Sequence, residues 1–443
     1  MAADPATFVR SYFEALMESQ YWPAERMLAE QRKYLGALIR HARDFAPFYA
    51  NRFDALFRPG GEIDWDRWND VPIVTRQEAL EHNDALLSTN PPPNHGPTKA
   101  GYTSGSTGAP LRIMQSQRSN MVLTASLYRS QYWHQLDWSR DMLVWFGEDP
   151  EKGRLPGGDI RPNWGPPWEP RATGKRISVN RYNQAEPVLH FMRDRDFGYL
   201  SARPAAADAL ALESERLGIK IDLDAILTFS TGTRPDERED FRRAFGARDI
   251  APYSAREGQF MAYQCPTGLH YHINDESVVV EILDEAGRPC PPGVEGRVIV
   301  TPLYNYAQPL IRYEQGDLAV LGGPCACGRT LRVIERIVGR TAHLFRFPGG
   351  KTVSLSMAID TQALLGARYW QIAQIAPLVI EVRYVPIDER VGDEAAIAQI
   401  IRQKTVPEVE IKFSRRADLN RTDGRKYIEY VYEVDESAER QSS

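Results

Sequence analysis

A run of hydroxyl and glycine residues between Tyr102 and Pro110 has the clearest chemical potential in this sequence. It reads Tyr-Thr-Ser-Gly-Ser-Thr-Gly-Ala-Pro, with four Ser/Thr hydroxyls and two glycines. Glycine lets the backbone turn so that successive N–H groups converge on an anion, and hydroxyls add donors to phosphate oxygens. No lysine follows the second glycine, so this is not a P-loop of the GxxxxGK[ST] type. The residue types fit a phosphate-binding loop and fit a plain flexible loop equally well. As a phosphate loop, its candidate ligands are Thr103, Ser104, Gly105, Ser106, Thr107 and Gly108.

Three of the four cysteines form a second group that could do chemistry. Cys265 lies close to His270 in the sequence, and one residue separates Cys325 from Cys327. Three thiolates and one imidazole are the Cys3His set of a closed tetrahedral zinc site, which is structural because it leaves no open position. The alternative is a set of reduced, buried cysteines with a surface histidine, since Cys-x-Cys is less diagnostic than CxxC. His272 is a spare candidate that we expect to be a solvated strand residue.

The elements that must position these groups alternate between helix and strand in the first part of the chain. Apolar residues at helical spacing predict a helix over 24–43. A second helix is predicted over 121–136, and an apolar run of strand length, 142–146, follows it. This alternation is typical of α/β folds.

The second half of the chain is richer in strands. Two β-rich runs, 277–284 and 296–303, are joined by Gly and Pro residues that fit a turn between antiparallel strands, so we expect a β subdomain. Beyond residue 340 the pattern predicts a compact α+β domain of about 100 residues, with strands over 378–385, 408–413 and 427–434 and a helix over 395–403. Because 443 residues exceed what one core usually supports, we expect two domains, 1–339 and 340–443.

Composition excludes several classes of function. The formal net charge is −5 and there is no long Lys/Arg run, so the sequence lacks the electrostatic footprint of a nucleic-acid binder. No apolar run reaches the roughly 18 residues of a membrane span, and the first residues do not show a signal-peptide pattern. We therefore expect a cytoplasmic protein without nucleic-acid or membrane partners; the oligomeric state is not indicated.

Four motifs, in the right order, resemble those of the adenylate-forming superfamily, which includes the acyl-CoA synthetases. The loop after Tyr102 resembles the phosphate loop of that superfamily, 253–257 its YGxTE motif, 312–317 its RYxTGD motif, and 424–426 its C-terminal lysine motif. The segments 268–270 and 325–340, and the early ARDFAPFYANRF, resemble more specifically the phenylacetate-CoA ligase branch and its capsule-biosynthesis relatives. The resemblance runs from about residue 24 to residue 434.

This resemblance implies a fold and a set of roles. The fold would be α/β, with a large N-terminal adenylate-forming domain of α/β and β subdomains and a small mobile α+β C-terminal domain. Glu257 would hold Mg2+, Asp317 would bind the ribose hydroxyls, and Lys426 would be the catalytic lysine. The other implied nucleotide-binding residues are Ser230, Thr231, Gly232, Tyr253, Ser254, Arg256 and Arg340.

The implied activity is activation of a carboxylic acid by ATP to an acyl-adenylate with release of pyrophosphate, followed by transfer to CoA. This chemistry brings two anions together, which Mg2+ and convergent donors must offset, and Lys426 suits the charge that develops at the α-phosphate. Departures from the branch at 341–343 and 347–352 leave room for an amine acceptor, which would make the protein an amide synthetase. A catalytically silent nucleotide-binding scaffold is the alternative from another class. Aromatic residues between 132 and 168 could shape a pocket for an aryl acid, although each is also explained by packing.

Overall fold

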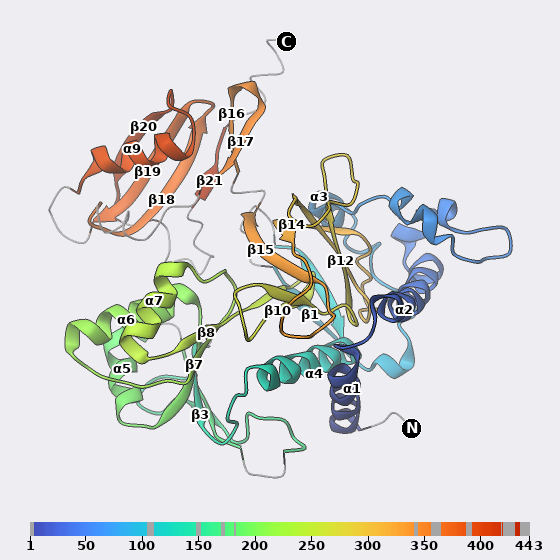
Figure 1. The fold of residues 1–443 in the computed structure, drawn as a ribbon, viewed down its shortest axis with the longest axis horizontal. Helices are drawn as coiled ribbons and strands as arrows, with labels where there is room; N and C mark the ends of the chain where they lie inside the picture. The colour runs from blue at the N-terminus through green and yellow to red at the C-terminus, as the bar shows by residue number, and fades with distance from the viewer. Residues whose placement is uncertain are drawn as a thin grey trace.

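The computed structural model describes residues 4–103, 110–147, 152–169, 173–180, 183–340, 344–355, 365–386, 392–417, 419 and 430–434. Figure 1 shows an α/β group in green, a β-rich group with the blue N-terminal helices beside it, and an orange-to-red group that carries the last strands. In the described part of the chain, the α-helices outside the α/β group are α1 (Pro5–Ser19), α2 (Ala24–Phe45), α3 (Arg76–Glu81), α4 (Gln117–Trp133) and α9 (Glu394–Lys404).

The α/β group contains a six-stranded sheet in the order β4-β5-β3-β6-β7-β8, parallel except for the β4–β5 pair. Alternate residues of β3 face opposite sides: Leu143 packs with the helices, and Met142 and Val144 belong to a separate cluster on the other face. The elements are β3 (Asp141–Gly147), β4 (Asp159–Arg161), β5 (Arg176–Asn180), β6 (Phe197–Ala202), β7 (Ala225–Thr228), β8 (Arg248–Ile250), α5 (Ala185–Arg193), α6 (Pro204–Leu217) and α7 (Pro235–Phe245).

The β-rich group is a seven-stranded antiparallel sheet in the order β12-β13-β14-β15-β11-β10-β9. Leu35, Leu38 and Ile39 of α2 pack into its core because helical spacing places them on one face. The strands are β9 (Pro252–Ala255), β10 (Gln259–Gln264), β11 (Tyr271–Ile273), β12 (Val278–Leu283), β13 (Glu295–Pro302), β14 (Tyr313–Leu321) and β15 (Val333–Arg340). The expected antiparallel pair and the helix from residue 24 are confirmed.

The last group has its own apolar cluster, built from residues between 345 and 413 and Tyr430. Its four-stranded sheet has the order β20-β19-β18-β21, and α9 packs against it through Ile397 and Ile401. The strands are β16 (Leu344–Phe347), β17 (Lys351–Ser354), β18 (Ala367–Ala376), β19 (Val379–Pro386), β20 (Glu410–Arg415) and β21 (Tyr430–Tyr432). The predicted helix and the strands over 378–385 and 408–413 are confirmed, and of the strand predicted over 427–434 the structure describes residues from 430 on, with β21 at 430–432. The central strand β18 was not expected.

The unexpected strand β18 carries a buried polar residue. Gln374 is fully buried, and its amide accepts from Arg346 N and donates to Arg346 O over 2.8 and 2.6 Å. A glutamine at a core position interrupts the apolar pattern by which a strand is recognised.

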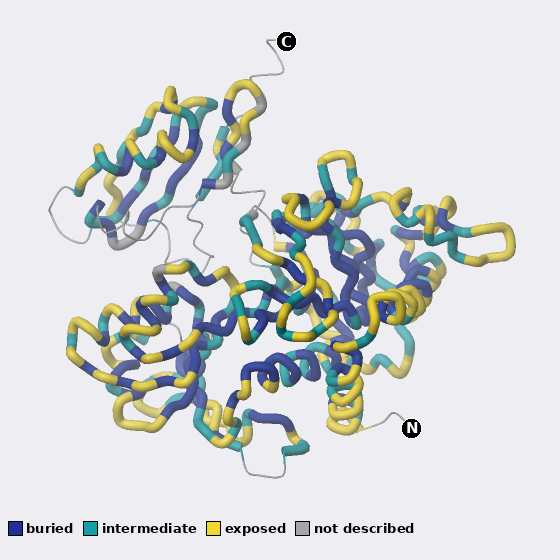
Figure 2. The backbone as a smooth tube through the Cα atoms, viewed as in Figure 1, coloured by how far each residue is buried: buried dark blue, intermediate teal, exposed yellow. Residues whose placement is uncertain are grey.

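Burial follows the sheets. Figure 2 shows the central strands of both large sheets as mostly buried and much of α1 as exposed. Among the described residues, none of the helices combines the length and apolar character needed to cross a membrane.

Candidate nucleotide-binding site

A short β-hairpin presents the predicted phosphate loop. Strands β1 (Thr98–Tyr102) and β2 (Arg112–Ser116) pair antiparallel, and Thr103 and Leu111 close the base of the loop. Thr103 N donates to Leu111 O, and Leu111 N donates to Thr103 Oγ1, each over 2.9 Å. The predicted ligands Ser104, Gly105, Ser106, Thr107 and Gly108 lie outside the described residues, so the structure locates their loop by its two ends.

Arg76 joins this hairpin to the second motif. Its Nη1 donates to Glu257 Oε1 and its Nη2 to Thr103 Oγ1, both over 3.1 Å. Arg76 is the first residue of α3, where Thr75 and Glu78 form a capping box that fixes the start of the helix. Two residues predicted separately, Thr103 and Glu257, are therefore brought together by a third that was not predicted.

The Thr75–Glu78 capping pattern could have revealed a helix start at Arg76. Its partner Glu257, however, lies 181 residues further along the chain, and such a pairing cannot be read from local sequence.

Glu257 is a buried carboxylate, 7 % exposed, while the side chain of Arg76 is 28 % exposed. A buried carboxylate requires a compensating cation or hydrogen bonds. Arg76 supplies the cation at Glu257, the residue proposed to hold Mg2+.

Tyr253 and Asp317 also meet. Tyr253 OH donates to Asp317 Oδ2 over 2.8 Å, and both residues are buried. Tyr253 lies on β9, and Asp317 lies on β14, next to the paired end of β15. The second and third predicted motifs are therefore in direct contact through this hydrogen bond.

Ser254 and Arg256 follow Tyr253 in the chain. Arg256 is exposed, and its side chain crosses the backbone of Gly101 on β1, so closely that a Cβ there would lie 3.2 Å from the guanidinium. Ser254 pairs with Phe260 in the β9–β10 ladder. Arg256 therefore lies beside the strand that leads into the phosphate loop.

Ser230, Thr231 and Gly232 form the exposed tip of the loop that connects β7 to α7. The tip follows the carboxyl end of a strand in a mainly parallel sheet, which is where such sheets bind ligands.

The remaining nucleotide-site predictions concern the last part of the chain. Arg340 is the final residue of β15, and its backbone pairs with Asp317. The predicted domain boundary, 339/340, therefore falls at the end of a strand of the seven-stranded sheet and remains a prediction. Lys426 lies outside the described residues.

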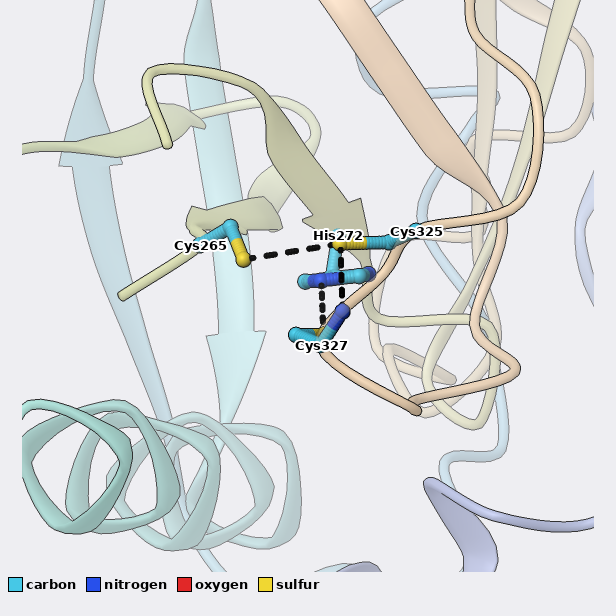
Figure 3. A group of neighbouring side chains, drawn as sticks. All are labelled: Cys265, His272, Cys325 and Cys327. Atoms are coloured by element: carbon cyan, nitrogen blue, oxygen red, sulfur yellow. Dashed lines mark hydrogen bonds between the residues drawn. The ribbon is translucent and has the colours of Figure 1, made fainter. Parts of the chain in front are cut away.

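The cysteine group converges at one end of β11. Figure 3 shows Cys265, His272, Cys325 and Cys327 directed toward one another. Their ligand atoms all lie within 4.8 Å of one another, and Cys265 Sγ is 3.7 Å from Cys325 Sγ. Zn–S bonds of about 2.3 Å in a tetrahedron require sulfur atoms about 3.8 Å apart. The donor set and this spacing fit a zinc ion.

Two histidines compete for the fourth position. His270 Nε2 lies 3.0 Å from Cys325 Sγ, and His272 Nε2 lies 3.2 Å from Cys327 Sγ. His272 is fully buried, so the expectation of a solvated strand residue is wrong. It lies on β11, where Tyr271, His272 and Ile273 are all buried because both faces of the strand are covered.

The pKa shifts of His272 and Cys327 favour metal binding, whereas that of Cys325 opposes it. Burial lowers the pKa of His272 to about 4, which keeps its imidazole neutral, the form that binds metals. Burial raises the pKa of Cys325 to about 11. Burial also acts to raise the pKa of Cys327, but hydrogen bonds from Arg329 and the neighbouring thiols outweigh it, so that this pKa is lowered.

The aromatic residues that suggested an aryl pocket have separate packing roles. The indole N–H groups of Trp133, Trp145 and Trp164 donate to Gln20 Oε1, Asn180 O and Arg140 O. These partners belong to different parts of the molecule, so packing explains these tryptophans better than a shared pocket does.

Comparison with known proteins agrees with this geometry. No family model matches the chain. It is 24% identical over 349 residues to the phenylacetate-coenzyme A ligase of Thermus thermophilus, a match that covers 75% of this chain and 74% of that one.

Many solved structures resemble the fold. A 2-hydroxyisobutyryl-CoA ligase in the postadenylation state with R3-HIB-AMP has a TM-score of 0.68 at 18% identity, over 96% of both chains. The same ligase with 2-HIB-AMP and CoA in the thioesterification state has a TM-score of 0.62 at 18% identity, again over 96% of both. ATP-bound MatB of Rhodopseudomonas palustris has a TM-score of 0.50 at 15% identity, over 77% of this chain and 67% of that one.

The chain therefore has the fold of the adenylate-forming acyl-CoA ligases, and the predicted fold class is confirmed. The resemblance to the phenylacetate-CoA ligase branch, predicted from the motifs, is confirmed as well. The homologues are acid-CoA ligases, and the complexes of the 2-hydroxyisobutyryl-CoA ligase contain an acyl-AMP and CoA.

Proposed function

We propose that this protein is an AMP-forming acid-CoA ligase, which activates a carboxylic acid with ATP and transfers the acyl group to CoA. The observation that carries the proposal is the convergence at Arg76, where the end of the phosphate-loop hairpin meets the buried carboxylate Glu257. The contact between Tyr253 and Asp317 adds the third motif.

Each proposed group has a physical reason for its role. Thr103 anchors the loop whose backbone N–H groups would bind phosphate. Asp317 presents a carboxylate that can accept hydrogen bonds from ribose hydroxyls, and Tyr253 orients it through the 2.8 Å hydrogen bond. Arg76 offers a planar guanidinium, which suits bidentate phosphate recognition.

Glu257 is the proposed Mg2+ ligand. Mg2+ is usually held by one or two carboxylates together with substrate phosphates, so a single buried carboxylate beside a phosphate loop fits. When bound, the ion would neutralise charge on the phosphates. Arg76 balances Glu257 in the ligand-free protein and also contacts Thr103, at the base of the proposed phosphate loop.

Attack of the acid on the α-phosphate would need a further cation. We assign this role to Lys426, together with nucleotide contacts from Ser104, Gly105, Ser106, Thr107, Gly108, Ser254, Arg256 and Arg340. A lysine supplied by a second domain can act in the first half-reaction and then withdraw to admit the acceptor. We propose 1–339 and 340–443 as these two domains.

CoA is the proposed acceptor, in line with the acid-CoA ligases that the chain resembles. The amine acceptor stays a second candidate because of the departures at 341–343 and 347–352. A cytoplasmic location is proposed on the same basis as the reaction, since ATP and CoA are available there.

We further propose a structural zinc ion held by Cys265, Cys325, Cys327 and one of the two histidines, His270 or His272. The mutual distances and burial favour His272. The ion would tie β11 to the loop between β14 and β15 and contribute folding energy.

The test is pyrophosphate release from ATP and Mg2+ across a panel of aliphatic and aryl acids, with and without CoA or amines. We expect release to depend on one class of acid, and CoA to yield a thioester detectable by mass spectrometry. Asp317→Ala is the matched negative control. An adenylate that persists with CoA but is consumed by an amine would establish the amide synthetase instead. No release with any acid would refute adenylation.

A further inference from the structure

A buried polar network closes the base of the loop between β7 and α7. Thr228 Oγ1 and Thr233 Oγ1 lie 2.9 Å apart at the two ends of the loop. Thr228 donates its hydroxyl to Asp249 Oδ1 over 2.7 Å, which leaves its lone pair to accept the hydroxyl hydrogen of Thr233. Arg238 Nε donates to the other carboxylate oxygen, Oδ2, over 3.0 Å.

The register of the sheet explains how these residues meet. Ile226 of β7 pairs with Asp249 of β8, and Thr228 lies on the same face as Ile226, two residues further on. Thr228, Thr233 and Asp249 are 1%, 7% and 8% exposed. A buried carboxylate is costly without partners, and here Thr228 at the loop end and Arg238 of α7 provide them.

A second contact holds Phe229, the residue directly before the tip of the loop. The ring of Phe229 packs edge-on against Phe146 at the end of β3, with centroids 4.9 Å apart. Ser230 follows with φ of +75°, a left-handed conformation that a non-glycine residue keeps only where its surroundings impose it. Ser230, Thr231 and Gly232 are all exposed between these two anchors.

Asp249 also lies a few residues before Tyr253 in the chain. Strand β8 ends at Ile250, and β9 begins at Pro252, directly before Tyr253. The strand that carries Asp249 therefore leads within a few residues to the tyrosine that hydrogen-bonds Asp317.

We propose that Asp249 is a positioning residue of the nucleotide site. Through Thr228 and Thr233 it holds the exposed tip, 230–232, whose three residues are predicted nucleotide contacts, in the conformation that binds the nucleotide. This inference rests on the proposed function, because that function supplies the purine nucleotide.

The closing experiment compares Thr233→Val, which removes one hydroxyl at nearly constant volume, and Asp249→Asn with the wild-type protein. Ser214→Ala is the matched control: it removes a buried hydroxyl that donates to Ile219 O over 2.6 Å at the end of α6, away from the loop. Hydrogen exchange of a peptide spanning 229–233 is measured in the intact, ligand-free protein. ATP and GTP dissociation constants are measured by calorimetry, and kcat at saturating ATP.

We expect exchange in 229–233 to become severalfold faster in both variants and to stay at the wild-type rate in Ser214→Ala. The dissociation constant of ATP should rise about 3- to 10-fold, the loss expected for one net hydrogen bond, and the preference for ATP over GTP should fall. At saturating ATP, kcat should stay within about twofold, because Thr233 and Asp249 are buried below the loop and are not among the proposed contacts to the phosphates.

Unchanged exchange, or faster exchange with unchanged ATP affinity, overturns the proposal, even if the variants melt at a lower temperature. The proposed function fails separately: if the wild-type protein binds ATP but releases no pyrophosphate with any acid, exchange and affinity still decide the role of Asp249. A wild-type protein that binds no purine nucleotide overturns both.

Discussion

At the scale of single residues, Arg76 is the group on which the nucleotide site converges. It donates to Thr103 and to Glu257 from a helix start that belongs to none of the recognised motifs. A guanidinium in this position can balance the carboxylate in the free protein and contact phosphate when ATP is bound.

Replacing Arg76 by alanine should therefore weaken the reaction with ATP. A hydrogen bond to a charged group contributes about 1.5–3 kcal/mol, so kcat/KM for ATP should fall roughly 10- to 100-fold. Arg76→Lys should give an intermediate value, because it keeps the charge and loses the planar fork. The measurement is pyrophosphate release at varied ATP.

The control for this prediction is Arg67→Ala. Arg67 pairs with Asp70 on the surface, and both side chains are about half exposed, so its removal should leave the rate unchanged. Wild-type kinetics in Arg76→Ala would rule out a role in nucleotide binding.

At the scale of elements, the cysteine and histidine cluster links β11 with the loop that follows β14. Purified protein should contain about one zinc per chain. Cys325→Ser should lose the metal and melt at a lower temperature before ATP binding is affected, because a structural zinc contributes folding energy. Metal analysis and thermal melting are the measurements.

Cys290→Ser provides the matched control, since Cys290 is a buried cysteine whose Sγ faces Glu295 O instead of the cluster. It should keep its zinc. Comparing His270→Asn with His272→Asn identifies the fourth ligand, and we expect the larger loss of metal in His272→Asn. Metal-free protein, prepared reduced and without chelators, would contradict the prediction.

Helices α6 and α7 meet at a group of buried carboxylates. Burial raises the pKa of Asp208 to about 7, assisted by a hydrogen bond with Asp240 and by the negative charges of Glu237 and Asp240, whereas Arg234 lowers it. The folded protein thus binds more protons than the unfolded chain between about pH 4 and pH 7. The free energy of unfolding therefore falls as pH rises through this window.

Asp208→Asn should remove this pH dependence. The variant should be more stable than wild type at pH 8, by on the order of 1–3 kcal/mol in the free energy of unfolding, and nearly unchanged at pH 4. Urea unfolding at the two pH values is the measurement, with the exposed Asp222→Asn as control. Equal stabilisation at both pH values would mean that Asp208 is not protonated in the folded protein.

At the scale of the whole molecule, the last group of elements packs separately from the elements of the nucleotide site. Its strands and α9 form a separate apolar cluster. Figure 1 shows this orange-to-red group beside the rest of the protein. A catalytic residue carried there would need to be delivered by docking.

Lys426→Ala should therefore bind ATP nearly normally and release pyrophosphate at least about a hundredfold more slowly, by analogy with the loss of one oxyanion donor. Supplied with a prepared acyl-adenylate, it should still complete transfer to the acceptor. Lys412→Ala is the control, since Lys412 is an exposed lysine on β20 paired with Glu410. Wild-type release, or equal loss of both half-reactions in a folded variant, would exclude the assigned role.

The sequence by itself determined the class of fold, some of the helices and strands, and the three motifs that meet in space. Tight turns, apolar periodicity and hydroxyl-glycine runs are local properties, so helix 24–43, the 277–303 strand pair and the loop after Tyr102 could be predicted. Strand β18 was not predicted, because the buried Gln374 interrupts its apolar pattern. The amide of Gln374 is hydrogen-bonded to the backbone of Arg346, which is distant in the chain.

Only the tertiary structure decided which residues complete the sites. Arg76 meets Glu257 across 181 residues, and Asp249 closes a loop through the register of two strands. His272 is buried because both faces of β11 are covered by other parts of the protein. Each of these depends on long-range packing, which sets the position of a side chain without leaving a local pattern in the sequence.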